Sequence, residues 1–307
     1  MPEPVACSLC GGSERTTLFR THDRLFATPE RYQYVRCARC GLVYLDPQPT
    51  WDERAARYAE SYRGYHRLET EPSPLQRRSM NYGLWKRWRI ISKRRAGGRL
   101  LDVGCGGGDF LDWVCQQPHW SGYGMERVAG MARTARDRYG RTITLGDLLS
   151  AGFVSGAFDV VTLWTVLEHL PDPAQGLAEC ARLLRPNGLL IVRTVTEESW
   201  GRRLFGPCWV GYDAPRITVV FSRPTLRRLL AQSGFEVLDL GGSFHDFHPY
   251  LWSWRNTCAA IGCWPWLCAA STRLLGSWPV RLVSFPFFAL QTTLGGNSFV
   301  TAIARKR

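Results

Sequence analysis

Lysine is scarce in this 307-residue chain, although the chain is strongly basic. The lysines are Lys86, Lys93 and Lys306, so nearly all of the 39 basic residues are arginine, and the formal net charge is +13. Such a charge ordinarily favours nucleic acid or an anionic membrane as the partner. A composition dominated by arginine can equally follow from the base composition of a genome. The charge alone therefore selects no partner.

Other features are missing as well. The first 14 residues hold no apolar run of the kind that a secretory signal peptide needs. Several of the 11 cysteines stand isolated, which disfavours a disulfide framework and fits a reducing compartment. No uncharged stretch in the apolar C-terminal region reaches the length that spans a bilayer. We expect a cytoplasmic globular protein with one core of about 200 residues plus appendages.

The most informative segment is a glycine-rich turn near residue 100. Residues 100–108 have the sequence LLDVGCGGG, in which two leucines and a valine surround Asp102. This pattern predicts a buried strand that breaks into a turn with Gly104, Gly106 and Gly108 at alternate positions, followed by a helix with an acidic first residue. Such a turn lets a ligand lie against bare backbone, where any Cβ would clash.

Acidic residues follow the turn at the spacing that a nucleotide site needs. Glu126 closes the second apolar run about 20 residues further on, where a dinucleotide-type fold places its ribose-binding acid. Asp147 follows the third apolar run. Further apolar runs alternate with helical stretches of about 10 to 15 residues, which predicts a doubly wound parallel sheet. The expected strands are 100–103, 122–126, 142–145, 158–164, 189–193, 235–240 and 298–304.

Together these segments resemble the class I S-adenosylmethionine (SAM)-dependent methyltransferases. The Asp-x-Gly-x-Gly-x-Gly pattern of residues 102–108 matches the first motif of that family, residues 158–161 (FDVV) match its fourth-strand motif, and residues 183–190 (LLRPNGLL) match the entry to its fifth strand. Nicotinamide enzymes have a different register, Gly-x-Gly-x-x-Gly, whose third glycine faces a pyrophosphate. Because SAM has no phosphate, an acid before the first glycine is tolerable. The resemblance therefore favours methyl transfer over hydride transfer.

The resemblance also implies which residues bind the cofactor. The glycines of the turn would form the backbone floor beneath SAM, and the acid before them would lie near its methionine end. Glu126 would accept hydrogen bonds from both ribose hydroxyls, with a solvated strand-end acid as the alternative. Asp147 would accept from the adenine amino group, with a helix N-cap as the alternative, and Leu148 would cover the ring. The predicted cofactor-binding residues are Asp102, Gly104, Gly106, Glu126, Asp147 and Leu148.

Two Cys-x-x-Cys pairs stand near the N-terminus. Cys7 and Cys10 form the first pair, Cys37 and Cys40 form the second, and a glycine follows each pair. Two such knuckles bring four thiolates into the tetrahedral arrangement that zinc prefers, with no ligand position left for water. We predict a structural Zn²⁺ in a zinc ribbon, fed by a strand at 32–35. Redox-active or unliganded cysteines are the alternative.

A ribbon ending in CARCGLVYLDP (residues 37–47) and joined to a SAM domain resembles a bacterial group of zinc-ribbon methyltransferases. Members of that group are often associated with the modification of sugars, polysaccharides or secondary metabolites. The resemblance covers most of the chain and implies an α/β fold: a Rossmann-like seven-stranded sheet with helices on both faces, plus the ribbon and a C-terminal helical insertion. The expected domains are a zinc ribbon at 1–48, a helical linker or lid at 49–98, the SAM-binding core at 99–249 and 291–307, and a Trp-rich insertion at 250–290.

Two features of the linker can each be interpreted in two ways. A helix at 51–67 carries Tyr58, Tyr62 and Tyr65, which would either cover the cofactor, as in related enzymes, or simply pack on the core. Residues 86–99 hold seven basic residues with a tryptophan among them, which would suit a groove for phosphates. We favour the exposed face of a helix instead. The buried stripe of that helix would be Leu84, Trp88 and Ile91.

His169 is the candidate catalytic base. Alignment of the nucleophile with an activated methyl group supplies much of the rate of methyl transfer, but an oxygen nucleophile also benefits from a base. His169 follows the predicted fourth strand, where ligands of open α/β sheets bind. The neighbouring Glu168 could bind substrate or a metal. Because Glu-His recurs in this superfamily across different substrates, a structural or cofactor-shell role for His169 is the alternative.

The segment after the fifth strand departs from the family pattern. Residues 199–222 form an insertion suited to a substrate lid and resemble the family's Phe-Gly…Trp…Pro-Arg-His stretch. Ile217 stands at the position of the family histidine, so this chain lacks any base or substrate ligand that the histidine provides. Arg216 remains as a partner for a carboxylate or phosphate. His245 and His248 would either replace the histidine in part or be ordinary loop residues.

Tryptophan and arginine are concentrated in residues 250–290. These residue types beside apolar helices suit a membrane interface. A helical hairpin that covers the sheet edge or forms a dimer contact is the alternative. The protein would accordingly be cytoplasmic. The first interpretation adds peripheral contact at the inner face of the membrane, and the second is compatible with an oligomer.

The function that we expect is SAM-dependent methyl transfer to a small-molecule, sugar or lipid-linked acceptor, with oxygen favoured as the accepting atom. The first alternative is an RNA methyltransferase that binds phosphates through the ribbon and the arginines. Residues 163–166 (LWTV) stand where exocyclic base-amine methyltransferases carry an Asn-Pro-Pro-Tyr-like segment, so nucleic acid is not the expected partner. The second alternative, motivated by Ile217, is an inactive partner subunit that binds SAM.

Overall fold

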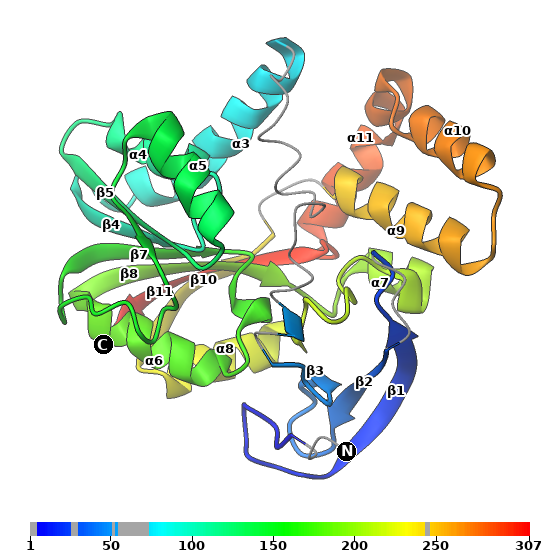
Figure 1. Cartoon of the computed structure of the whole chain (residues 1–307), viewed down its shortest axis with the longest axis horizontal. Coiled ribbons are helices and arrows are strands. Elements are labelled where there is room, and N and C mark those ends of the chain that lie inside the picture. The colour runs from blue at the N-terminus through cyan, green and yellow to red at the C-terminus, as the bar shows by residue number, and fades with distance from the viewer. Residues whose placement is uncertain (1–4, 26–29, 51–52, 55–73, 243–245) are drawn as a thin grey trace.

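The protein is described by a computed structural model with a large central sheet, a small N-terminal sheet and a group of three helices near the C-terminus (Figure 1). The residues that the structure describes are 5–25, 30–50, 53–54, 74–242 and 246–307. Predictions on four residues fall outside these ranges. They are Tyr58, Tyr62, Tyr65 and His245.

Seven strands form the central sheet, in the order β10-β11-β8-β7-β4-β5-β6. Strands β8, β7, β4, β5 and β6 pair in parallel, whereas β11 is antiparallel to both β8 and β10. The bounds are β4 Gly98–Val103, β5 Trp120–Glu126, β6 Ile143–Leu145, β7 Phe158–Trp164, β8 Leu184–Val195, β10 Phe235–Gly241 and β11 Phe299–Lys306. The predicted Rossmann-like seven-stranded sheet is confirmed. Strand β8 begins earlier than predicted, because it includes the turn that precedes its apolar half.

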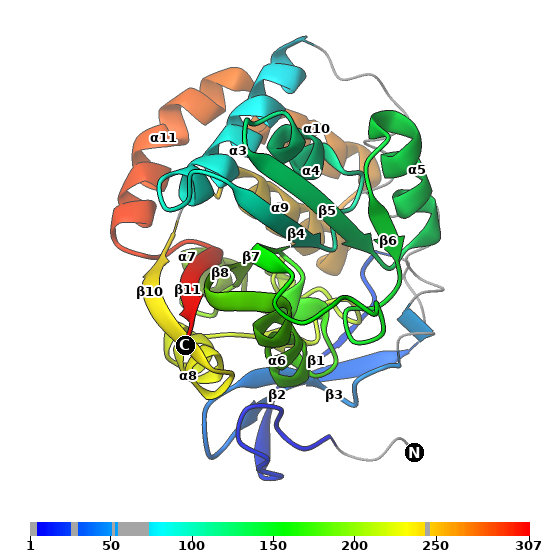
Figure 2. The same cartoon turned by 90° about the vertical axis from the view of Figure 1, so that its left-hand side faces the viewer.

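Helices cover both faces of this sheet (Figure 2). Helices α3, α4 and α5 lie on one face, and α6 and α8 lie on the other (Figure 1). The bounds are α3 Pro74–Ser92, α4 Asp109–Cys115, α5 Ala129–Tyr139, α6 Pro173–Leu183 and α8 Arg223–Gln232. Local sequence sets the starts of the last two helices. The Asp172 side chain accepts from two backbone amides of the first turn of α6, and Ser222 and Thr225 form a capping box on α8.

The middle strands are apolar on both faces. Leu100, Leu101, Val160, Val161 and Leu163 are completely buried. Such continuous apolar runs are typical of parallel strands covered by helices on each side. The same arrangement brings the carboxyl ends of β4, β5 and β7 to one edge of the sheet, which is where open α/β sheets bind ligands.

The small sheet has the strand order β1-β2-β3-β9. Its bounds are β1 Arg15–His22, β2 Arg31–Cys37, β3 Val43–Asp46 and β9 Val219–Val220. Strand β9 comes from the segment after β8 and pairs with β3 antiparallel, Val43 opposite Val220 and Tyr44 opposite Val219. The N-terminal sheet therefore extends beyond the ribbon predicted at 1–48, because a strand distant in sequence covers its edge.

The segment predicted as a substrate lid is largely built into the protein core. It contains α7 Trp200–Phe205 and the short helix η2 Gly206–Cys208 before it reaches β9. Trp209 is completely buried and packs with Tyr34 and Tyr212 in a second apolar cluster. This cluster joins the small sheet to the central one.

Three helices follow β10 and stand away from the central sheet (Figure 1). They are α9 Phe247–Ala260, α10 Pro265–Leu275 and α11 Trp278–Thr293. The helical block thus runs over 247–293, slightly longer than the predicted 250–290. Among the described residues, no helix is long and apolar enough to span a membrane.

Candidate active site

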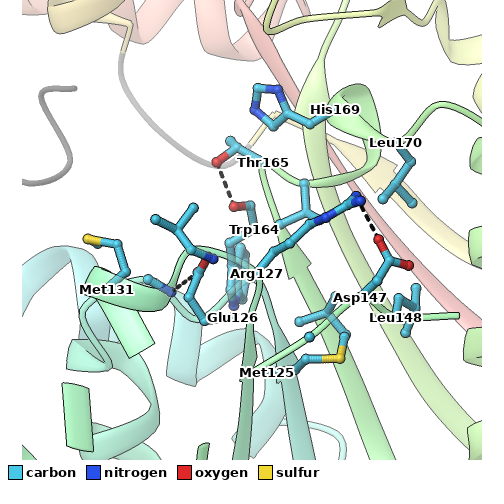
Figure 3. A pocket seen from close by; sticks show the side chains of 16 residues that line it. Met125, Glu126, Arg127, Met131, Asp147, Leu148, Trp164, Thr165, His169 and Leu170 are labelled. Carbon is cyan, nitrogen blue, oxygen red and sulfur yellow. Dashed lines mark hydrogen bonds and ion pairs between the residues drawn. The ribbon is translucent and has the colours of Figure 1, made fainter. Parts of the chain in front are cut away.

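A cavity of about 240 Å³ opens at the carboxyl ends of β4, β5, β6 and β7 (Figure 3). Its walls come from the glycine turn after β4, the end of β5 with the start of α5, the loop after β6 and the turn after β7. Five of the predicted cofactor-binding residues line it. These are Gly104, Gly106, Glu126, Asp147 and Leu148, and the predicted base His169 lines it as well.

The glycine turn has the conformation that its sequence predicts. Gly104, Gly106 and Gly108 have φ values of +66°, +56° and +82°, which side chains rarely adopt. A Cβ on Gly104 would lie 2.6 Å from a methyl carbon of Val166, and one on Gly108 would lie 3.0 Å from the Cβ of Ala135. Gly104 and Gly106 therefore shape the cavity, whereas Gly108 lets α4 pack against α5.

Glu126 holds the turn closed from the end of β5. One carboxylate oxygen accepts the Gly106 amide at 2.9 Å, and the other accepts the Val128 amide at 2.8 Å. The side chain is nearly buried, and this burial raises its pKa. Each carboxylate oxygen has a further lone pair, so Glu126 can still accept hydrogen bonds from a ligand in the cavity.

Asp102 lies beneath the turn rather than in the cavity wall. Its carboxylate is buried in the middle of the sheet and accepts a hydrogen bond from the Thr162 hydroxyl at 2.6 Å. Burial raises its pKa to about 7, against the opposing effects of the Thr162 hydrogen bond and the charge of Arg87. A positive charge placed near this carboxyl would therefore favour its ionised form.

Asp147 and Leu148 form the opposite wall, after β6. The Asp147 carboxylate pairs with Arg127 at 2.6 Å (Figure 3). It also accepts the Leu149 amide at 2.9 Å. The second contact closes a turn after β6; no helix begins at Asp147, in contrast to its alternative interpretation as a helix N-cap. The ion pair with Arg127 was missed at the sequence level, where only the adjacency of Arg127 to Glu126 could have indicated it.

His169 sits at the end of the short helix η1 (Leu167–His169), directly after β7. Its ring Nδ1 lies 2.8 Å from the carbonyl oxygen of Arg216, and its own carbonyl oxygen accepts from Arg54 at 2.7 Å. A carbonyl oxygen can only accept, so Nδ1 carries a proton, and in the neutral ring the lone pair then lies on Nε2. This tautomer is the one that a general base needs.

The segment 216–218 fixes the turn that carries His169. The Thr218 amide donates to the Glu168 carbonyl oxygen at 2.8 Å, and the Thr218 hydroxyl lies 3.0 Å and 3.1 Å from the Glu168 and Leu170 carbonyl oxygens. On its other side, the Thr218 carbonyl accepts the Leu45 amide at the end of β3. Thr218 therefore joins the N-terminal sheet to the turn that carries the candidate base.

Arg216 does not face the cavity. Its guanidinium is completely buried and binds Asp23 at 2.9 Å and Asp213 at 2.6 Å. The prediction that Arg216 binds a substrate carboxylate or phosphate is wrong, because two carboxylates of the chain itself occupy it. Ile217 is also buried, in the second apolar cluster, where its carbonyl oxygen accepts from the Tyr34 hydroxyl at 2.7 Å. His248 lies on α9 and is not among the residues that line the cavity.

The four predicted cysteines do meet. Their sulfur atoms all lie within 4.8 Å of one another, with Cys7 and Cys40 at 3.4 Å and Cys10 and Cys37 at 3.6 Å. Thiolates around a tetrahedral ion with 2.3 Å bonds would be about 3.8 Å apart. The cluster therefore has the donors and nearly the spacing that a bound metal ion needs.

The basic segment 86–99 uses several of its cations within the protein. Arg89 lies over the Trp85 ring, Arg87 lies over the Trp164 ring, and Arg94 is 3.8 Å from Asp239. Ile91 is completely buried beneath the helix, with Leu84 and Trp88 packed beside it. Residues 86–92 therefore form part of a helix, as predicted, whereas residues 93–97 connect α3 to β4 and the last two residues of the segment belong to β4.

Comparison with known proteins decides the family. A methyltransferase-domain family model matches residues 79–240, which is more than half of the chain. The chain is a SAM-dependent methyltransferase. The match includes the four strands that border the cavity, β4 to β7. Most of the small sheet and the three C-terminal helices lie outside it.

Relatives of this methyltransferase include two proteins named ubiquinone biosynthesis O-methyltransferase. The one from Aromatoleum aromaticum is 34% identical over 49% of this chain and 69% of its own length, and the one from Thiobacillus denitrificans is 33% identical over 52% and 74%. A solved SAM-dependent methyltransferase from Archaeoglobus fulgidus superposes with a TM-score of 0.50 at 17% identity, covering 74% of this chain and 94% of that one. The structural likeness at this identity shows the fold alone.

Proposed function

We propose that this methyltransferase transfers a methyl group to an oxygen atom of a small-molecule, sugar or lipid-linked acceptor. The observation that carries the proposal is the tautomer of His169, whose Nδ1 donates to the Arg216 carbonyl oxygen. A base held in this way suits a hydroxyl nucleophile, which must lose a proton as it attacks. The relatives named as O-methyltransferases support the same choice of atom.

The cavity has the features that an adenosyl group requires. Gly104 and Gly106 offer bare backbone, Glu126 offers a carboxylate for a diol, and Met125 and Leu148 offer apolar walls. When bound there, SAM would supply an activated methyl group. Glu126 would hold the ribose, Asp147 would accept from the adenine amino group, and buried Asp102 would balance the positive charge at the methionine end.

The protein itself then contributes a proton acceptor and the contacts that position it. The Nε2 of His169 would take the proton from the acceptor hydroxyl, whose oxygen would receive the methyl group as its bond to the sulfur atom of SAM breaks. Arg54 and Thr218 keep the histidine turn in place through its backbone. Alignment supplies the rest of the rate, because a positioned nucleophile avoids the entropy cost of a bimolecular encounter.

We further propose that the four N-terminal cysteines hold one structural Zn²⁺. All four donors would be protein sulfur atoms, so no position remains for a reacting water. The prediction that residues 250–290 contact the inner face of a membrane is compatible with a lipid-linked acceptor, which is presented at such a surface.

The acceptor class is tested by transfer of tritiated methyl from SAM into a cell extract, followed by separation of lipid, sugar and RNA. We expect label in the lipid or sugar fraction with the wild type and much less with His169→Asn. Label confined to RNA would favour the RNA alternative instead. The affinity for RNA should then fall steeply as the salt concentration rises. SAM binding with no labelled fraction would favour the inactive-subunit alternative.

A further inference from the structure

Large apolar side chains are exposed together on α10, α11 and the loops that precede them. Trp264, Trp266 and Trp278 are 68%, 63% and 60% exposed, and Leu282 and Val283 are 71% and 81% exposed. No residue of α10 is buried. Figure 1 shows this helix at the outer edge of the molecule, far from the central sheet. An apolar surface of this kind marks an interaction site, because water opposes its exposure.

The charged side chains of the three C-terminal helices are all positive. Residues 247–293 contain no aspartate or glutamate, and their charged residues are Arg255, Arg273 and Arg281. Among the residues that the structure describes, none of these three arginines forms a salt bridge. A second copy of the same surface would place like charges opposite one another, whereas an anionic surface would complement them.

The arrangement of the apolar residues also favours a flat apolar medium. On α11, Leu282, Val283 and Phe285 point in directions spread over about 160°, since successive helix residues turn by about 100°. A single helix of a protein partner would cover a narrower stripe of apolar residues on α11 than this spread. Trp264 and Trp278 stand at the starts of α10 and α11, and tryptophan concentrates at the boundary between lipid and water.

We propose that α10 and α11 bind the surface of an anionic lipid bilayer. Trp264, Trp266 and Trp278 would enter the headgroup region. Arg273 of α10 and Arg255 of the adjacent α9 would contact lipid phosphates. Both helices are shorter than the bilayer requires, so they would lie in the interface plane rather than span it. The surface lies outside the residues that match the methyltransferase family, so the proposal concerns this chain and does not rest on the proposed acceptor.

Vesicle sedimentation tests the proposal with the full-length protein. Vesicles of phosphatidylcholine with added phosphatidylglycerol should bind the protein about tenfold or more tightly than pure phosphatidylcholine vesicles, and salt should weaken this preference. The triple variant Trp264→Ser/Trp266→Ser/Trp278→Ser should lose binding to both. The variant Arg255→Gln/Arg273→Gln should keep weak binding but lose the preference for phosphatidylglycerol.

The matched control is Val154→Ser/Leu204→Ser, which removes two similarly exposed apolar side chains outside the three helices. It should bind vesicles like the wild type, and thermal unfolding should show that every variant is folded. Failure of the wild type to bind phosphatidylglycerol vesicles would overturn the proposal, as would equal loss in the control. So would a stable dimer that the tryptophan variant dissociates, because the same surface would then be covered by a second copy.

Discussion

The Nδ1 of His169 and the carbonyl oxygen of Arg216 are 2.8 Å apart, so the neutral histidine has its proton on Nδ1 and its lone pair on Nε2. We expect His169→Asn to lower kcat by about 10²–10⁴-fold, the usual contribution of a general base. SAM affinity should change little, because the cavity floor does not depend on this side chain. Single-turnover kinetics and calorimetry on the same protein give both values.

The rival to this assignment is His248, the other described histidine that the sequence offers as a base. His248→Asn should leave kcat unchanged, because this residue does not line the cavity. An intact kcat in His169→Asn together with a loss in His248→Asn would reverse the assignment.

Glu126 should be the side chain on which SAM affinity depends most. Glu126→Gln should weaken binding by more than tenfold, since a hydrogen bond to a charged group contributes about 1.5–3 kcal/mol. Asp147→Asn should have a smaller effect, because Asp147 is only partly buried and already paired with Arg127. Glu179→Gln on α6, far from the cavity, serves as the control. Equal affinities for Glu126→Gln and Glu179→Gln in calorimetry would remove the ribose assignment.

Asp102 should make SAM binding depend on pH. Its pKa is raised to about 7, and a cation at the methionine end of the ligand favours the ionised carboxylate, so affinity should rise with pH up to about 7 and then level off. Thr162→Val removes the hydrogen bond that lowers this pKa and should shift the rise to higher pH. Asp102→Asn should abolish the rise. A pH slope that survives in Asp102→Asn would exclude this carboxyl as its source.

The same pKa has the opposite effect on folding. Asp102 takes up a proton on folding between about pH 4, the usual pKa of an unfolded aspartate, and pH 7. Its contribution to the free energy of unfolding therefore decreases as the pH rises through that window. Urea unfolding of the wild type and Asp102→Asn across this range should give curves that diverge toward neutral pH.

The cysteine cluster should carry about one zinc ion per chain, because four thiolates complete one tetrahedral site. Cys40→Ser should lower both the zinc content and the unfolding temperature, whereas Cys268→Ser on α10, outside the cluster, should change neither. Because Thr218 joins β3 to the histidine turn, removal of the metal should also lower kcat. Fresh reduced protein without metal would contradict the zinc proposal.

Arg216 should matter for stability rather than for substrate binding. Arg216→Met removes the cation that pairs with the buried carboxylate of Asp23, and breaking a buried pair in this way costs about 3–5 kcal/mol. The double variant Arg216→Met/Asp23→Asn should recover some of this loss, as urea unfolding can measure. A variant of normal stability with a raised KM for the acceptor would point to substrate binding after all.

Local patterns were sufficient to predict the central fold. The apolar runs indicated each strand of the large sheet, and the glycine spacing indicated the turn, because strand burial and positive φ values leave a signature within a few residues. The four cysteines could be grouped for a similar reason, since each knuckle is encoded by its own Cys-x-x-Cys.

Non-local contacts were beyond the reach of the sequence. Arg216 resembled a free anion-binding residue, and only the fold shows that Asp23, from the turn after β1, occupies it. The role of Thr218 depends on contacts to residues 168, 170 and 45 and has no local signature. The pairing of Asp147 with Arg127 likewise required the ends of β5 and β6 to lie side by side.

Strand β9 prevents a clean separation of the N-terminal sheet from the rest of the protein. Val219 and Val220 are fully buried as the edge partner of β3, although they lie more than 170 residues further along the chain. A protein shortened to begin at residue 49 would expose both valines and release the backbone that supports His169. The ribbon and the core should accordingly melt in one cooperative transition. An exchange of ribbons between relatives would have to carry the β9 segment with it to preserve the active site.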